Sequence, residues 1–75
     1  MKLSKVKLNA ECKIKSVNVK NEQTKIRLME LGLVEGTKII VNKKSVFKKT
    51  LLIIFCFSCF TLKENLAEEI EVEYA

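Results

Sequence analysis

The chain has 75 residues, a formal net charge of +5, and 48% apolar residues, a balance that suits one small globular domain over residues 1–75. A domain of this size buries only about 60–65% of its unfolded surface, which leaves little room for a deep catalytic pocket. The sequence contains no histidine, no aspartate and no glycine-rich phosphate loop, so a general base would lack its usual partner and we expect no enzyme.

The N-terminal third is predicted to contain one helical turn and one strand. Residues 3–8 favour a short turn of helix capped by Ser4. Residues 12–19 are predicted to form a strand in which Cys12 and Ile14 share one face while Val17 and Val19 lie on the other. This change of face near Ser16 indicates a bulge or a strong bend.

Residues 21–37 carry the clearest local signals in the chain. Asn21 is a suitable N-cap for a helix over residues 22–31, and Gly32 falls where a helix needs a positive φ to end. Leu33 can then fold back onto the last turn. Gly36 is suited to the positive φ of a type II turn over residues 34–37, and residues 38–43 follow as a strand.

The apolar residues of this helix form a wide stripe. We expect Ile26 and Met29 to face the core and Leu28 and Leu31 to lie at the edge of the stripe, where a partner has access to them. The alternative is that all four side chains belong to the core.

The C-terminal half is predicted to consist of strands. A basic loop over residues 43–49 precedes an apolar run at residues 51–62, which is too short for a spanning helix of roughly 20 residues. We divide this run into strands 51–56 and 59–63 that meet near Phe57 and Ser58. Residues 64–68 form a helical turn, and Ile70, Val72 and Tyr74 alternate with glutamates as in a half-buried strand.

Five short strands and one helix predict a mainly β fold, a small five-stranded barrel with one inserted short α-helix. The aromatic and cysteine residues near the strand junction cannot all point into so small a core. We therefore expect an exposed apolar patch over residues 55–60, suited to a protein contact or to self-association. Within it, Cys56 and Cys59 have the C-x-x-C spacing of metal sites, and Cys12 is a third thiol. Such a site normally has four ligands and the chain has no histidine, so we predict neither a metal nor a cofactor.

The central segment resembles a known family. Residues 28–37 read LMELGLVEGT and are similar to the L-x-E-L-G-L-x-P-G-T signature of FeoA, a small cytoplasmic component of bacterial ferrous iron uptake. The resemblance extends to both ends of the chain. The sequence departs from the family pattern at two places. Glu35 replaces the signature proline, and residues 45–50 read SVFKKT where the family usually has A-P-L-G-D-P.

The resemblance implies an SH3-like barrel that acts as a non-catalytic accessory or regulatory protein. Its implied partner is the cytoplasmic part of a FeoB-type GTP-binding iron permease, which would place it in the cytoplasm at the inner face of the membrane. The exposed helix face and the basic loop are the candidate contact surfaces. The residues proposed for partner binding are Arg27, Leu28, Leu31, Phe47, Lys48 and Lys49.

Charge leaves a second function open. Residues 1–50 contain 13 lysines and arginines against four glutamates, whereas residues 51–75 contain one lysine against five glutamates. A basic half suits an acidic protein, lipid headgroups or nucleic acid. The alternative function is therefore a stand-alone adaptor or regulator that binds peptide or nucleic acid. Because there is a single arginine and no aromatic residue interleaves with the lysines, we do not expect nucleic acid as the partner.

Overall fold

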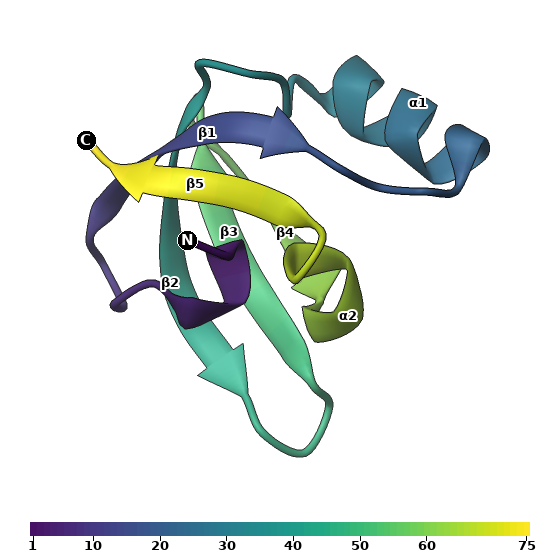
Figure 1. Cartoon of the computed structure of the whole chain (residues 1–75). Helices are drawn as coiled ribbons and strands as arrows, with labels where there is room; N and C mark the ends of the chain where they lie inside the picture. The colour runs from purple at the N-terminus through teal and green to yellow at the C-terminus, as the bar shows by residue number, and fades with distance from the viewer.

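A computed structural model describes all 75 residues as one five-stranded antiparallel sheet that curls into a small barrel (Figure 1). The strand order is β4-β3-β2-β1-β5, so β4 and β5 are the two edges. This arrangement confirms the predicted mainly β fold with one inserted helix. The strands are β1 (Glu11–Val17), β2 (Lys38–Ser45), β3 (Thr50–Phe55), β4 (Ser58–Lys63) and β5 (Ile70–Tyr74). The helical elements are η1 (Leu3–Lys5), α1 (Glu22–Leu31) and α2 (Glu64–Ala67).

The interior of the barrel is a single apolar cluster. All 16 buried residues are hydrophobic, and most come from alternate positions of the strands, such as Ile39 and Val41 of β2. The predicted alternation of β5 is confirmed, because Ile70 and Val72 are fully buried while the glutamates between and after them are more exposed. The fold is therefore held by burial of apolar side chains, with no charged group in its core.

Strand β1 contains the predicted irregularity. Ile14 pairs with Val72 of β5, whereas Ser16 pairs with Glu71, so one extra residue of β1 lies between these two pairs. A bulge of this kind bends the strand and changes which side chains face inward. The strand ends at Val17, earlier than predicted, although Val19 beyond it is still buried.

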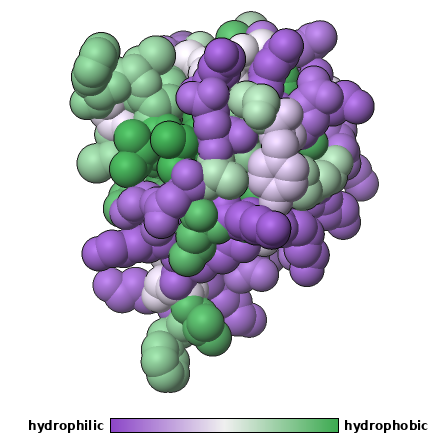
Figure 2. All heavy atoms as spheres, turned by 90° about the vertical axis from the view of Figure 1, so that its left-hand side faces the viewer, coloured by the Kyte–Doolittle hydropathy of each residue, from purple (hydrophilic) through white to green (hydrophobic).

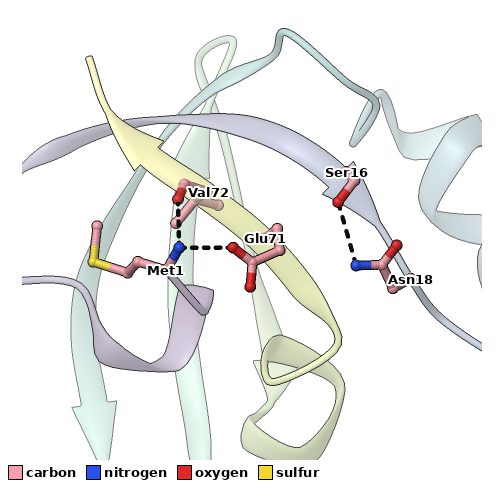
Figure 3. Close-up of polar contacts among 5 residues, drawn as sticks. All are labelled: Met1, Ser16, Asn18, Glu71 and Val72. Atoms are coloured by element: carbon pink, nitrogen blue, oxygen red, sulfur yellow. Dashed lines mark hydrogen bonds and ion pairs between the residues drawn. The ribbon is translucent and has the colours of Figure 1, made fainter.

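The N-terminal segment differs from the prediction. The helical turn is a 3₁₀ turn over Leu3–Lys5, and Ser4 does not cap it, because Ser4 lies inside the turn and its buried hydroxyl has no hydrogen-bond partner. The segment is fixed instead at its first residue (Figure 3). The Met1 ammonium donates to Glu71 Oε2 at 2.7 Å and to the Val72 carbonyl at 3.2 Å, and its hydrogen bond lowers the pKa of Glu71.

The same view contains a second short contact at the end of β1, where the Asn18 side-chain amide donates to the Ser16 hydroxyl at 3.2 Å (Figure 3). This bond lies at the point where the chain leaves the sheet towards α1.

Both hairpins of the C-terminal half are shifted from their predicted positions. Strand β2 continues to Ser45, which pairs with Thr50, so the basic loop is confined to residues 46–49. The β3–β4 turn lies at Cys56 and Phe57, one residue earlier than predicted. Both turn residues have positive φ, 48° and 63°, as in a type I′ turn. The pairing of Phe55 with Ser58 fixes this position, because it keeps the ring of Phe55 inside the barrel.

Helix α1 begins and ends as predicted. The Asn21 side chain accepts a hydrogen bond from the Thr24 amide, and Gly32 has a φ of 98°. The Gly32 amide donates to the Met29 carbonyl and the Leu33 amide donates to the Leu28 carbonyl, which is the Schellman arrangement. Leu33 is fully buried, so the chain is anchored directly after the helix.

The predicted orientation of α1 is wrong. Leu28 is its one buried residue, whereas Ile26 and Met29, expected in the core, are half exposed. The cause is that α1 stands beside the barrel and does not cover the sheet (Figure 1). A helix in this place needs only one inward side chain, and the Gly32–Leu33 anchor turns Leu28 inward.

Candidate functional site

Helix α1 presents an unusually open surface. Its apolar residues Ile26, Met29 and Leu31 are 50%, 55% and 53% exposed. An isolated helix of ten residues is marginal in water, so α1 depends on its two caps and on the burial of Leu28 and Leu33. The helix is therefore held in place mainly from one end, and its other faces remain without a partner.

One of these faces borders a shallow groove between α1 and β1. We call it the α1 groove, and its apolar lining comes from Val17, Met29, Leu33 and Val34. Lys25 and Glu35 provide charges at its edge. The prediction missed this groove because it placed Met29 in the core, and no local signal in the sequence marks the groove. Its apolar lining and charged edge are typical of a surface that receives a protein partner.

Arg27 and Leu31 lie on the other side of α1. They are four residues apart, so their side chains are neighbours on the helix surface, and both are exposed. Neither of the two ion pairs in the structure involves Arg27. Leu28 differs from both, because it is 3% exposed and belongs to the core, so it offers no side chain to a partner.

The other three predicted contact residues lie elsewhere. Phe47, Lys48 and Lys49 are exposed in the loop between β2 and β3, at the end of the barrel away from α1 (Figure 1). The Lys48 amide donates to the Ser45 hydroxyl, and Lys49 has a φ of 52°. The six predicted residues therefore form two separate surfaces and one core position.

An exposed apolar patch exists at the β3–β4 turn, as predicted. Phe57 is fully exposed, Cys56 and Cys59 are exposed, and Ile54 is 36% exposed. Figure 2 shows hydrophobic side chains gathered at this upper end of the molecule. Phe55 is the exception, since it is buried and its ring meets that of Phe60 edge to face, with centroids 5.5 Å apart. We call Ile54, Cys56, Phe57 and Cys59 the β3–β4 patch.

The three thiols have different surroundings. Cys12 is fully buried and its thiol donates to the Ala10 carbonyl, and burial, with a smaller contribution from Glu11, raises its pKa. Cys56 lies in the β3–β4 turn and Cys59 pairs across the hairpin with Ile54. The structure contains no cluster of three or more potential metal ligands. It also contains no helix of the length and apolar character needed to cross a membrane.

Comparison with known proteins identifies the family of this chain. A family model described as the FeoA domain matches residues 1–74. The FeoA protein of Chlorobium tepidum superposes with a TM-score of 0.90 at 31% identity, over 99% of this chain and 70% of that protein. The zinc-complexed FeoA of Stenotrophomonas maltophilia is reported as a prokaryotic SH3 domain protein. It superposes with a TM-score of 0.83 at 30% identity, over 97% of this chain and 89% of that protein. None of the curated proteins matches the chain.

The iron(II) transport protein A of Clostridium thermocellum is also similar, with a TM-score of 0.86 at 27% identity. This chain is covered completely in that comparison but spans only 46% of the other protein. The family match covers almost every residue described above, including the capped helix, the glycine turn and all five strands. The chain belongs to the FeoA family, the small SH3-like proteins of ferrous iron transport.

Proposed function

We propose that this protein is a non-catalytic accessory protein of bacterial ferrous iron uptake that binds the cytoplasmic part of a FeoB-type permease. The observation that carries the proposal is the unpartnered surface of α1, with three apolar side chains about half exposed. Membership of the FeoA family indicates that the process is ferrous iron transport. The Stenotrophomonas maltophilia relative is itself reported as a candidate activating factor of that transport. Contact with the permease would hold the protein at the inner face of the cytoplasmic membrane.

The contact is proposed to use both sides of α1. Met29 and Val34 in the α1 groove would lose water-exposed apolar surface on binding, which is the main favourable term in protein association. On the other side, Arg27 supplies a planar, permanently charged group beside the exposed Leu31. Arginine is one of the residue types enriched among the interface residues that dominate binding energy.

Calorimetry with the soluble GTP-binding domain of the cognate permease tests this proposal, in the presence of GDP and of a non-hydrolysable GTP analogue. Three variants introduce the same lysine: Met29→Lys in the α1 groove, Leu31→Lys beside Arg27, and Asn65→Lys in α2 as the control. All three positions are exposed, so the fold should persist in each. We expect Met29→Lys and Leu31→Lys each to weaken binding at least about tenfold, because each places a charge in an apolar contact.

The control sets the standard for a non-specific effect of charge. Asn65→Lys should leave the dissociation constant within about twofold, as is usual for surface substitutions away from an interface. Absence of binding in both nucleotide states would overturn the proposed partner. Equal weakening by all three variants would show that net charge, and not the surface of α1, governs the interaction.

Self-association is a second proposed contact, and it would use the β3–β4 patch. Phe57 is fully exposed at the tip of the hairpin, and β4 beside it is an edge strand with unpaired backbone groups. Sedimentation velocity at increasing concentration should detect dimers, and Phe57→Ser should shift the protein to the monomer. A protein that stays monomeric at high concentration, or a dimer that Phe57→Ser leaves intact, would exclude this patch as the contact.

A further inference from the structure

The loop between β2 and β3 carries two apolar side chains away from the barrel. Val46 is 84% exposed and Phe47 is 99% exposed, so the rest of the chain leaves both almost entirely in water. The loop forms the lowest point of the molecule in Figure 1, and Figure 2 shows hydrophobic side chains at the same end with hydrophilic ones above them. Exposed apolar side chains at a projecting tip are unfavourable unless something covers them.

The loop itself is held firmly. Ser45 pairs with Thr50 at its base, and the Ser45 hydroxyl accepts a hydrogen bond from the Lys48 amide at 3.3 Å. The Lys49 carbonyl accepts a bond of 2.9 Å from the Glu64 amide, which ties the hairpin to α2. The two apolar side chains are therefore presented by an ordered turn and not by a loose segment.

Lysines surround this tip on both sides. Lys43 and Lys48 line a shallow groove on one side of the hairpin, and Lys49 lines a groove on the other. Lys44 lies there too, but its ammonium already donates to the Ser4 and Val6 carbonyls, each at 3.0 Å. Glu64 is the single acidic residue among the linings of these two grooves. None of these lysines takes part in an ion pair.

We propose that the β2–β3 hairpin docks directly on an anionic lipid surface, with Val46 and Phe47 inserted among the lipids and the lysines at the headgroups. The lysine ring matches the negative charge of the lipids, and long lysine side chains place their ammonium groups at the polar boundary while the apolar tip goes deeper. The apolar tip alone, Val46 and Phe47, is smaller than a standard protein interface. A phenylalanine buries at most about 250 Å², whereas a stable interface needs roughly 800 Å² on each partner.

The absence of tryptophan from the chain allows a direct test. The Phe47→Trp variant carries one fluorophore at the tip, and the Phe57→Trp variant carries it at the β3–β4 turn, which is equally exposed at the other end of the barrel. On addition of vesicles containing phosphatidylglycerol, we expect a blue shift of emission, and quenching by brominated acyl chains, for Phe47→Trp alone. Pure phosphatidylcholine vesicles should change neither spectrum.

Cosedimentation of the wild-type protein and of single variants with the same vesicles measures how much each side chain contributes to binding. Lys48→Gln and Lys49→Gln should each weaken binding about fivefold, and Phe47→Ser roughly tenfold. Lys20→Gln, which removes an exposed lysine between β1 and α1, serves as the control for net charge and should have a much smaller effect. Binding should also decrease strongly as salt is raised.

Several results would overturn the proposal. It fails if the wild-type protein does not bind anionic vesicles at low salt, if Phe47→Ser binds as well as the wild type, or if Phe57→Trp shifts as much as Phe47→Trp. If vesicles are not bound but Phe47→Ser weakens binding to the permease domain, the hairpin is a protein contact. The vesicles contain no permease, so the result with vesicles does not depend on whether the proposed partner is correct.

Discussion

Replacing Leu28 by alanine is expected to lower the free energy of unfolding by about 2–4 kcal/mol, the usual cost of removing a buried leucine side chain and leaving a cavity. Leu28 is 3% exposed and is the only residue of α1 in the core. A domain of this length has a total stability of about 4–11 kcal/mol, so the loss is a large fraction of it. Urea denaturation followed by circular dichroism measures the change.

Leu31→Ala is the matched control. The two leucines lie in the same helix, so the change in helix propensity is the same, but Leu31 is 53% exposed and leaves no cavity when shortened. We expect it to change stability by less than about 0.5 kcal/mol, as for most surface substitutions. Equal losses in the two variants would contradict the orientation of α1 described above. A large loss for Leu28→Ala alone also means that this variant cannot serve as a probe of partner binding.

The features predicted correctly are those that have local signals. Asn21, Gly32 and Gly36 each meet a backbone requirement that few other residues satisfy, so the caps and the turn of the central segment follow from the sequence. The alternation in β5 follows in the same way, because a strand with one buried face needs apolar residues at every second position.

The features predicted wrongly depend on the tertiary structure. Helix α1 has two adjoining apolar stripes with the same helical spacing, one through Ile26 and Met29 and one through Leu28 and Leu31. Periodicity alone does not show which stripe faces the core. The choice is made outside the helix, where Leu33 enters the core. The β3–β4 turn had no glycine or asparagine to mark it, so its position depended on the pairing of β3 with β4.

The candidate surfaces were only partly accessible to prediction. The exposure of Phe47, Lys48 and Lys49 follows from their position in a basic loop, which the run of lysines in the sequence indicates. The α1 groove does not follow, because it arises where α1 meets β1 after the bulge near Ser16 has redirected the chain. A surface that two distant segments form together has no signature within either segment.

Replacing Gly32 by alanine is expected to cost about 1–3 kcal/mol, for two separable reasons. Gly32 has a φ of 98°, and an L-residue in the left-handed region costs roughly 1–2 kcal/mol. In addition, a Cβ at this position would lie 3.3 Å from Cε2 of Phe55, whose ring is held edge to face against Phe60. The new methyl group must therefore displace either the end of α1 or a buried aromatic ring.

Gly36→Ala separates the two costs. Gly36 has nearly the same φ, 93°, but a Cβ there meets no atom within 4 Å, so only the backbone strain remains. Urea denaturation of both variants should give a larger loss for Gly32→Ala, and the excess should disappear when Phe55→Leu is introduced into both. If the two glycine variants lose the same stability, the ring of Phe55 yields without cost. The end of α1 would then be held by the Schellman bonds and Leu33 alone, and not by its packing on the β3–β4 hairpin.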